Sequence, residues 1–526
     1  MISDLASDAL PEALNTDVCI IGAGPAGITL ALTLARHNVD VVLLESGGET
    51  VEPEIQELYH SEVVGRPHIG IHEGRTRAFG GTSTRWGGQI LPLFPIDFED
   101  RPWIKLSGWP IGLEELQPYL VRALPFEGLE RCLTDDAAVW RTIGLRMPKF
   151  GNDLESFLTR WCPEPDFGRL HGAEIKLLPN LMCVMHATVV TLETQEGRIS
   201  SVLAKTLSGK MLEVRARRVV FCVGAIETPR LLLQQLKDGR APPWAHSGHN
   251  VGNYFQDHPA VTCADILPHK RGTIPQLFDQ IYHRRMKYQP RIMLSAARQR
   301  SLRSLNAGGT VLAQTEYTDT MNQTKVAGRA LLRGGPSRTA IANAASSAIK
   351  GAPFLARWFW RSFVKRRAFN PHDLGFRLGV QVEQPPRAES RVSLSSEVDA
   401  LGMPRARLDW RLGKEEVDAI ADFAETVKSA FEKEGIAQVR IDADVASRRT
   451  DMLARVVDQD HHMGTARMAR SVDTGVVDAN LKMFQTENGY VCSSAVFPTS
   501  SFSNPTHTLI ALAIRLGDHL QSARSP

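Results

Sequence analysis

The stretch DVCIIGAGPAGITLALTLARHNVDVVLLE, residues 17–45, decides the fold of this chain. Its first apolar run, 18–21, predicts a buried strand, the leucine-rich segment that follows predicts a helix, and the last run predicts a second strand. Gly22 permits a tight turn, Gly24 lets the backbone approach a pyrophosphate, and Gly27 lets the helix pack closely on its strand. The stretch therefore predicts a Rossmann-like unit that binds a dinucleotide.

Glu45 ends the second strand, where a carboxylate can accept hydrogen bonds from the ribose hydroxyls of adenosine. This acidic residue argues against the 2′-phosphate of NADP, and the helix N-terminus suits the pyrophosphate charge. We expect Ala26 and Ser46 to contact the cofactor as well. No second fingerprint follows in the chain. The unit alone therefore leaves either an NAD enzyme or a flavoprotein that takes its electrons from a substrate.

The composition excludes several classes of protein. The chain has 526 residues, of which 43% are hydrophobic and 23% charged, with a net charge of +3. The length predicts two large domains or one domain with a big insertion, and the mild charge predicts no nucleic-acid partner. The N-terminus does not resemble a secretory signal, and no run of about 18 apolar residues predicts a transmembrane segment. We therefore expect a cytoplasmic protein.

The seven cysteines are far apart and odd in number, and they show no metal-ligand spacing. They predict buried free thiols in a reducing compartment and no metal site.

Two further segments predict contacts with the nucleotide. RAFGGTSTRWGGQ, residues 77–89, is a glycine-rich loop whose aromatic residues argue against the alternative of a mobile surface loop. RRVVFCVGAIETPRLLL, residues 217–233, predicts a buried parallel strand, a glycine turn and the start of a helix. In and near these segments we expect the cofactor to contact Gly81, Thr82, Trp86, Gly87, Val189, Gly224 and Ala225.

Near the C-terminus, Asn504 precedes Pro505 and a helical run with leucines on one side. Asparagine as N-cap followed by proline is a common helix start, so capping alone would explain Asn504. A helix N-terminus directed at a flavin would also stabilise the negative charge of the reduced ring. The two interpretations are compatible.

Together these segments resemble the glucose–methanol–choline (GMC) oxidoreductases, FAD flavoproteins that oxidise alcohols. VGNYFQDHP, residues 251–259, is similar to a family turn, and residues 383–412 look like the family's substrate-domain strands. The loop 80–88 and the following residues 107–120 look closest to a bacterial branch near pyranose oxidase and the sugar dehydrogenases. The resemblance implies an α/β fold with a Rossmann-like FAD-binding domain and a substrate domain built on an antiparallel sheet.

The resemblance also implies a discontinuous FAD-binding domain, made of residues 14–100, 175–260 and 450–526. The substrate domain would comprise residues 101–174 and 261–449, with its sheet over the flavin face and helices behind it.

The same resemblance assigns the histidines of QDHHMGTARM, residues 459–468. The family's base is the histidine of an H-x-x-G-[TS] pattern, which places it at His461, and its partner position falls on Asn504 rather than His507. His461 would accept the hydroxyl proton while hydride leaves for flavin N5. The alternative is that His461 is a satisfied core residue, whereas we expect His462 to be a packing or supporting residue. Ser494 and Pro505 complete the expected FAD contacts.

Two departures from the family concern the cofactor. Arg85 stands where relatives with covalent FAD have histidine, so we expect non-covalent FAD. Ser493 stands where the family often has aspartate, which leaves that flavin contact open. Residues 352–367 are aromatic and basic, and they predict packing or a subunit contact in a possible homo-oligomer, or a membrane-surface helix.

We expect the substrate to be a small-molecule alcohol: a sugar, a glycoside or another polyol. An apolar secondary-metabolite alcohol is the alternative, and a lyase with structural FAD or an NAD dehydrogenase is less favoured. The electron acceptor would be oxygen or a small carrier.

Overall fold

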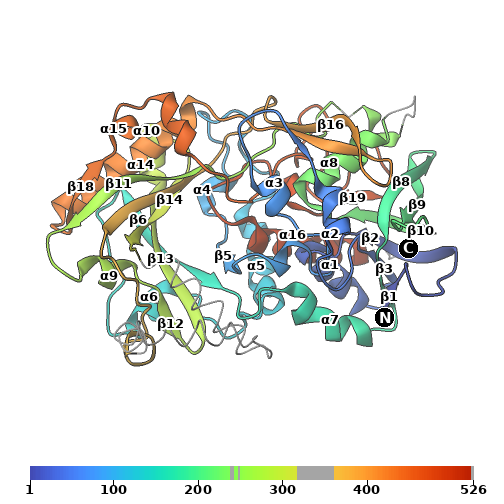
Figure 1. Cartoon of the computed structure of the whole chain (residues 1–526), viewed down its shortest axis with the longest axis horizontal. Coiled ribbons are helices and arrows are strands. Elements are labelled where there is room, and N and C mark those ends of the chain that lie inside the picture. The colour runs from blue at the N-terminus through green and yellow to red at the C-terminus, as the bar shows by residue number, and fades with distance from the viewer. Residues whose placement is uncertain (237–241, 247–248, 317–359, 523–526) are drawn as a thin grey trace.

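The computed structural model describes residues 1–236, 242–246, 249–316 and 360–522 (Figure 1). Two large sheets lie toward opposite ends of the longest axis, and C-terminal segments run between them. This arrangement confirms the expected fold class, in which a parallel nucleotide-binding sheet is joined to an antiparallel sheet.

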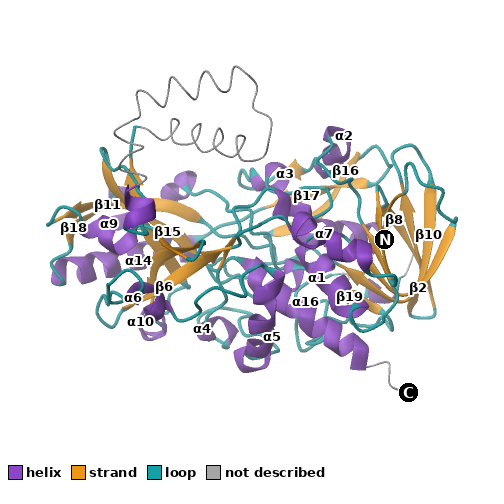
Figure 2. Cartoon of the chain, turned by 90° about the horizontal axis from the view of Figure 1, so that it is seen from below, coloured by secondary structure: helices purple, strands orange, loops and turns teal. Residues whose placement is uncertain are grey.

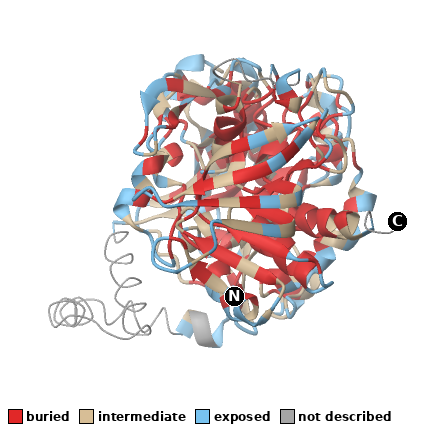
Figure 3. Cartoon of the chain, turned by 90° about the vertical axis from the view of Figure 1, so that its right-hand side faces the viewer, coloured by how far each residue is buried: buried red, intermediate tan, exposed pale blue. Residues whose placement is uncertain are grey.

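The first sheet is mainly parallel. Among the described residues it contains eight strands in the order β1-β7-β3-β2-β10-β9-β8, and β19 also pairs with β10. Only β9 and β8 run antiparallel to their neighbours. Figure 3 faces this end of the molecule and shows buried residues along the middle of the sheet. The strands are β1 (Ile2–Asp4), β2 (Ala13–Ile21), β3 (Val41–Leu44), β7 (Leu181–Met185), β8 (Thr188–Gln195), β9 (Arg198–Lys205), β10 (Met211–Phe221) and β19 (Gly489–Val491).

The predicted strand–turn–helix–strand unit is present as β2, α1 (Pro25–Ala35) and β3. Gly22 has a φ of +101°, and a Cβ there would lie 2.8 Å from the carbonyl oxygen of Cys222. A Cβ on Gly27 would lie 1.9 Å from the Gly22 carbonyl oxygen. Only glycine therefore allows the turn and the close packing of α1, of which every residue after Pro25 is buried.

Helices cover the parallel sheet, as Figure 2 shows for α1, α7 and α16. The C-terminal helix α16 (Pro505–Ser522) begins at Pro505 as expected and packs on both α1 and α5 (Leu113–Phe126). Helix α7 (Phe167–Leu177) also packs against α1. Helices α5 and α7 thus lie against the nucleotide-binding helices, whereas β6 (Leu154–Trp161) between them belongs to the antiparallel sheet. The range 101–174, which the sequence predicts to belong to the substrate domain, therefore contacts both sides.

The second sheet is antiparallel throughout. Its eight strands among the described residues follow the order β18-β11-β15-β14-β13-β6-β5, with β12 paired to β13. Helix α14 (Lys414–Lys433) packs its buried residues against this sheet and so forms the expected helical backing. The strands are β5 (Gln89–Ile90), β6 (Leu154–Trp161), β11 (Ala260–Pro268), β12 (Ile281–His283), β13 (Met286–Leu294), β14 (Ala307–Gln314), β15 (Gly375–Val382) and β18 (Ala437–Ile441).

A third, small sheet differs from the expectation for residues 383–412. Strand β16 (Arg391–Val398) pairs with β17 (Pro404–Asp409), and β17 pairs with β4 (Glu62–Val63). In the described residues none of the three pairs with either large sheet. They pack against α8 (Gly224–Gln234), with which they share an apolar cluster. Apolar packing therefore joins this stretch to the nucleotide side.

The short helices occupy the connections between these elements. They are α2 (Pro53–Gln56), α3 (Gly70–Glu73), α4 (Pro95–Phe98), α6 (Asp136–Arg141), α9 (Thr273–Phe278), α10 (Ala296–Leu302) and α15 (Ala443–Ala446). The division into domains at residues 100, 174, 260 and 449 stays a proposal.

The basic aromatic segment lies partly outside the described residues, which exclude 352–359. In its described part, Arg361 pairs with Asp279 at 2.6 Å, and Arg367 donates to the Pro275 carbonyl at 2.7 Å. These contacts favour packing for Arg361 and Arg367, whereas the side chains of Trp360 and Val364 are exposed.

Candidate active site

A cavity of about 800 Å³ opens at the C-terminal ends of β2, β3 and β10, and it extends to side chains of β5, β6, β13 and β15. It brings together nearly all the site residues expected from the sequence. Gly27 is the exception, because it serves the packing of α1 rather than the cavity wall. The expected residues that line the cavity are Gly22, Gly24, Ala26, Glu45, Ser46, Gly81, Thr82, Trp86, Gly87, Val189, Gly224, Ala225, His461, Ser494, Asn504 and Pro505.

At the nucleotide end, Glu45 follows β3 and is 5% exposed. Its carboxylate accepts hydrogen bonds from the backbone N–H groups of Ala23 at 2.9 Å and Gly47 at 3.0 Å. Burial raises the pKa of Glu45, and these backbone donors oppose the shift. The carboxylate is therefore fixed beside the turn, where it can accept further hydrogen bonds from a ligand.

The glycine-rich loop lies over the turn before α1. A Cβ on Gly81 would stand 2.9 Å from the Cα of Gly24, so the two backbones approach closely. The indole of Trp86 is anchored by a hydrogen bond of 2.8 Å from Nε1 to the Pro165 carbonyl. Arg85 beside it is exposed. This loop is an ordered wall of the cavity rather than a mobile surface loop.

Three glycines in the cavity wall leave room for a bound FAD. An added Cβ on Gly24, Gly87 or Gly224 would meet no described atom within 4 Å, so these backbones border open space. Gly24 also precedes the first turn of α1, where backbone N–H groups are free to bind phosphate. Ser493, at the position where the family often has aspartate, instead accepts a hydrogen bond from the Ala495 N–H at 3.3 Å.

His461 is the centre of the catalytic end. Its Nδ1 lies 2.9 Å from Nδ1 of His258, and its Nε2 lies 3.3 Å from Nδ2 of Asn504. The backbone N–H of His461 donates to Asp257 Oδ1 at 3.1 Å. Asn504 is therefore beside His461 as expected, whereas His258 is a ring partner that sequence reasoning missed.

The hydrogen bonds around His258 determine its tautomer. Its Nε2 must donate to the carbonyl oxygen of Ser500, 3.2 Å away, so in the neutral ring Nδ1 is an acceptor. Nε2 of Gln381, which donates to the Phe502 carbonyl at 2.7 Å, also donates to this Nδ1 at 2.7 Å. His461 must then carry its proton on Nδ1 and donate it to His258.

This leaves Nε2 of His461 as an unprotonated acceptor that faces Asn504. Burial, followed by the charges of His258 and Arg291, lowers the pKa of His461 to about 3. Burial lowers the pKa of His258 as well. Both rings are therefore neutral at physiological pH, and the unprotonated Nε2 of His461, which accepts a hydrogen bond from Asn504 Nδ2, is the basic position of the site.

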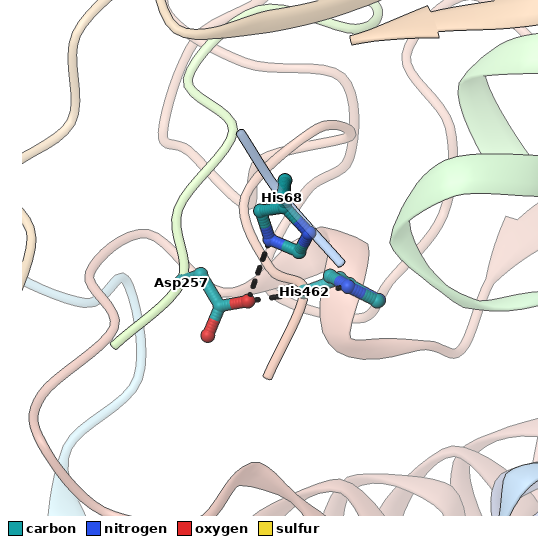
Figure 4. Close-up of side chains that lie close together, drawn as sticks. All are labelled: His68, Asp257 and His462. Atoms are coloured by element: carbon teal, nitrogen blue, oxygen red, sulfur yellow. Dashed lines mark hydrogen bonds and ion pairs between the residues drawn. The ribbon is translucent and has the colours of Figure 1, made fainter. Parts of the chain in front are cut away.

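Asp257 links His461 to a buried polar cluster, drawn in Figure 4. Its Oδ2 accepts from Nε2 of His68 at 2.9 Å and lies 3.9 Å from Nε2 of His462. These three ligand atoms lie within 4.8 Å of one another, a spacing that could hold a metal ion. Nδ1 of His68 accepts from the Ile71 N–H, so its Nε2 carries the proton shared with Asp257. In this state the cluster orders the loop that carries His461.

His462 and His507 occupy different surroundings. The ring of His462 packs against His68 and Phe255, and its Nε2 has no hydrogen-bond partner among the described residues. His507 bonds Glu127 at 2.8 Å and does not line the cavity.

A buried charge network beside Ser46 was also missed. Glu227 pairs with Arg75, Arg77 and Arg230 at 2.7–2.9 Å, and Arg77 donates to the Ser46 hydroxyl at 2.8 Å. These arginines hold the pKa of Glu227 at about 2 despite its burial. The sequence did offer a signal for this network. Arg75 and Arg77 are two arginines separated by one residue, just before and at the start of the glycine-rich loop.

Comparisons with known proteins agree with this geometry. Residues 386–513 match the family model of GMC oxidoreductases, and residues 16–66 match that of pyridine nucleotide-disulphide oxidoreductases. The chain is 26% identical to 2-methyl-1,2-propanediol dehydrogenase of Mycolicibacterium austroafricanum, over 96% of this chain and 95% of that protein. It is 22% identical to 6'''-hydroxyparomomycin C oxidase of Streptomyces lividus, over 97% of this chain and 92% of that protein. The solved structure of pyridoxine 4-oxidase from Mesorbium loti is similar with a TM-score of 0.58 at 18% identity, covering 97% of this chain and 99% of that one.

The fold and site define a flavoprotein that oxidises CH–OH groups with FAD, as an oxidase or a dehydrogenase. The chain is similar to the GMC oxidoreductases, whose family model its residues 386–513 match. Among its described helices, none has the length and apolar character needed to cross a bilayer.

Proposed function

We propose that this enzyme oxidises a carbinol of a sugar, glycoside or other polyol, with His461 as the base. The observation that carries the proposal is the pair of contacts on the two nitrogens of His461. One contact supports a proton on Nδ1, and the other is a hydrogen bond between the Asn504 amide and the unprotonated Nε2.

Each of these residues has a distinct role in the proposed reaction. His461 Nε2 accepts the hydroxyl proton, which a neutral imidazole is suited to do at physiological pH. Asn504 Nδ2 donates a hydrogen bond to the same substrate oxygen and restricts its orientation. Asp257 and His258 hold the backbone and ring of His461. FAD, which the backbones at Gly24, Gly81 and Gly224 would hold, would supply the acceptor for the hydride that leaves the carbinol carbon.

The substrate end of the cavity supports a polar substrate. Its walls include the amides of Gln89 and Gln381, the guanidinium of Arg291, and the indoles of Trp86 and Trp161. Amide and guanidinium groups can hydrogen-bond hydroxyls, and flat indoles suit the apolar face of a sugar ring. Nε2 of Gln89 and Nε2 of Gln381 already donate within the protein. An apolar alcohol would therefore leave the Arg291 guanidinium as the polar group without a partner among the described residues.

Three residues support non-covalent FAD. Position 85 is arginine, which cannot form the bond that histidine makes in tethered relatives, and its side chain is exposed. Gly24 and Gly224 leave room for a bound group without any covalent contact.

The test is anaerobic reduction of the purified holoenzyme with matched sugars, glycosides, polyols and apolar alcohols. Bleaching of the flavin band by a polyol, and its loss in His461→Ala with FAD still bound, is the expected result. Bleaching by apolar alcohols alone would favour the secondary-metabolite alternative, and no bleaching by any alcohol would favour a lyase. Repeating the reaction with oxygen and with an artificial acceptor identifies the acceptor class.

A further inference from the structure

One cation at the substrate end of the cavity has no counter-charge. Arg291, in β13, lines the cavity together with His461 and Asn504. Among the described residues its guanidinium has no hydrogen-bond or ion-pair partner, and its Nε is buried. Burial lowers the pKa of Arg291 to about 10, so the side chain remains charged at neutral pH.

The buried arginines of the cavity differ from Arg291. Arg75, Arg77 and Arg230 all pair with Glu227 at 2.7–2.9 Å. Their charges are therefore compensated within the protein, and they need no ligand anion.

The carboxylates of the cavity are engaged elsewhere. Glu45 accepts from backbone N–H groups beside the nucleotide turn. Asp458 accepts from the backbone N–H groups of Ile69 and Gly70, at 3.0 and 3.2 Å. An added Cβ on Gly70 or Gly74 would lie 1.9 or 2.3 Å from Oδ1 of Asp460, so this carboxylate is packed against those two glycines. Among the described residues, no carboxylate forms an ion pair with Arg291.

The position of Arg291 indicates which molecule could supply an anion to pair with it. β13 belongs to the antiparallel sheet, which also contributes Gln89, Trp161 and Gln381 to the cavity wall. The phosphates of a dinucleotide would instead meet the turn before α1, on the parallel sheet. Arg291 is half-buried, and a charge that is partly removed from water without a partner is costly. A carboxylate can accept two parallel hydrogen bonds from a guanidinium. The substrate is therefore the group placed to supply the anion.

We propose that Arg291 binds the carboxylate of a hydroxylated acid, such as a sugar acid, whose carbinol is oxidised at His461. The inference rests on the proposed function for the reacting end of the substrate. The carbinol loses its proton to His461 Nε2 and its hydride to FAD, and becomes a carbonyl. The carboxylate is unchanged and only orients the molecule.

The experiment compares matched acids and alcohols on the oxidised holoenzyme. Gluconate is paired with glucitol, and glycerate with glycerol, and dissociation constants are measured from the perturbed absorbance of bound FAD. Because this readout needs no turnover, it is independent of whether His461 is the base. The variants are Arg291→Gln and Arg291→Lys. The control is Arg300→Gln, which removes an exposed arginine that pairs with Glu99 outside the cavity.

We expect the wild type to bind at least one acid about tenfold or more tightly than its neutral partner, since charge-assisted hydrogen bonds are roughly twice as strong as neutral ones. Arg291→Gln should abolish that preference, Arg291→Lys should keep part of it, and Arg300→Gln should keep all of it. His461→Ala should retain it as well, which separates this inference from the proposed base. Equal or weaker binding of both acids by the wild type would overturn the proposal. An unchanged preference in Arg291→Gln together with a lower flavin midpoint potential would also overturn it, because Arg291 would then serve the reduced cofactor.

Discussion

Removing the ring that accepts the His461 proton tests the tautomer directly. In the structure, His258 Nδ1 lies 2.9 Å from His461 Nδ1 and receives its hydrogen bond. His258→Ala leaves the Nδ1–H of His461 without this partner in a buried site. We expect this change to slow flavin reduction while substrate binding is retained, because His258 positions the base without lining the cavity.

The magnitude follows from the cost of an unsatisfied buried donor. Such a group costs about 1–3 kcal/mol. If this cost falls on the tautomer that reacts, the limiting rate should drop by about 5- to 150-fold, at 1.36 kcal/mol for each factor of ten. His258→Asn can place an amide oxygen near the position of Nδ1, so we expect it to recover much of the rate.

Anaerobic stopped-flow reduction, with the alcohol that reduces the wild-type flavin fastest, separates the limiting rate from the substrate dissociation constant. The matched control is His171→Ala, which removes a different buried histidine that bonds only the Phe126 carbonyl among the described residues. We expect the control to reduce its flavin at the wild-type limiting rate. A His258→Ala variant with FAD bound and an unchanged limiting rate would refute the positioning role. Equal losses in the Ala and Asn variants would refute the hydrogen bond as its cause.

The remaining predictions concern the base, its partner and the cofactor. His461→Ala should keep FAD but slow flavin reduction by roughly 10²–10⁴-fold, whereas His462→Ala should keep a large share of the rate; the opposite stopped-flow result would reverse the assignment. Asn504→Ser caps a helix about as well as asparagine, yet it should slow reduction by at least about tenfold because serine is too short to reach the substrate oxygen. Asn504→His should retain more activity than Ser, and a Ser variant at the wild-type rate would leave Asn504 as a helix cap only. Denaturation should release intact FAD because position 85 is arginine; yellow colour retained by the acid-precipitated chain would contradict this. The limiting rate should stay level as pH falls from about 8 to about 5, because the pKa of His461 is lowered to about 3 and the base is lost only on protonation; an acid limb near the ordinary histidine pKa of about 6.5 would show a different base.

Local patterns made the nucleotide unit predictable. Gly22, Gly24 and Gly27 are close in sequence, and each answers a requirement of one turn and the helix after it. The same holds for Asn504 and Pro505, because a helix start is specified within a few residues. His461 and His462 both line the cavity, so their position there does not distinguish them. The family pattern was needed to choose His461 as the candidate base.

The sequence alone does not predict how elements that are far apart in the chain pack together. The strands of residues 391–409 look like sheet formers, but the sequence does not say which sheet they join, and apolar packing against α8 places them on the nucleotide side. The sequence is equally ambiguous about which domain a segment near a predicted boundary belongs to. Helix α5, for example, packs against the C-terminal helix α16 although almost 400 residues separate them in the sequence.

The sequence by itself predicted the dinucleotide turn, the resemblance to the GMC oxidoreductases and the candidate base, because each rests on short motifs that can be recognised locally. Only the tertiary structure decided what surrounds that base. His258 lies 203 residues from His461, and Arg291 comes from a strand of the other large sheet. Strand pairing and the packing between the two sheets bring these side chains to one cavity. A ring tautomer and an unpaired charge are properties of that assembled environment, so no local pattern encodes them.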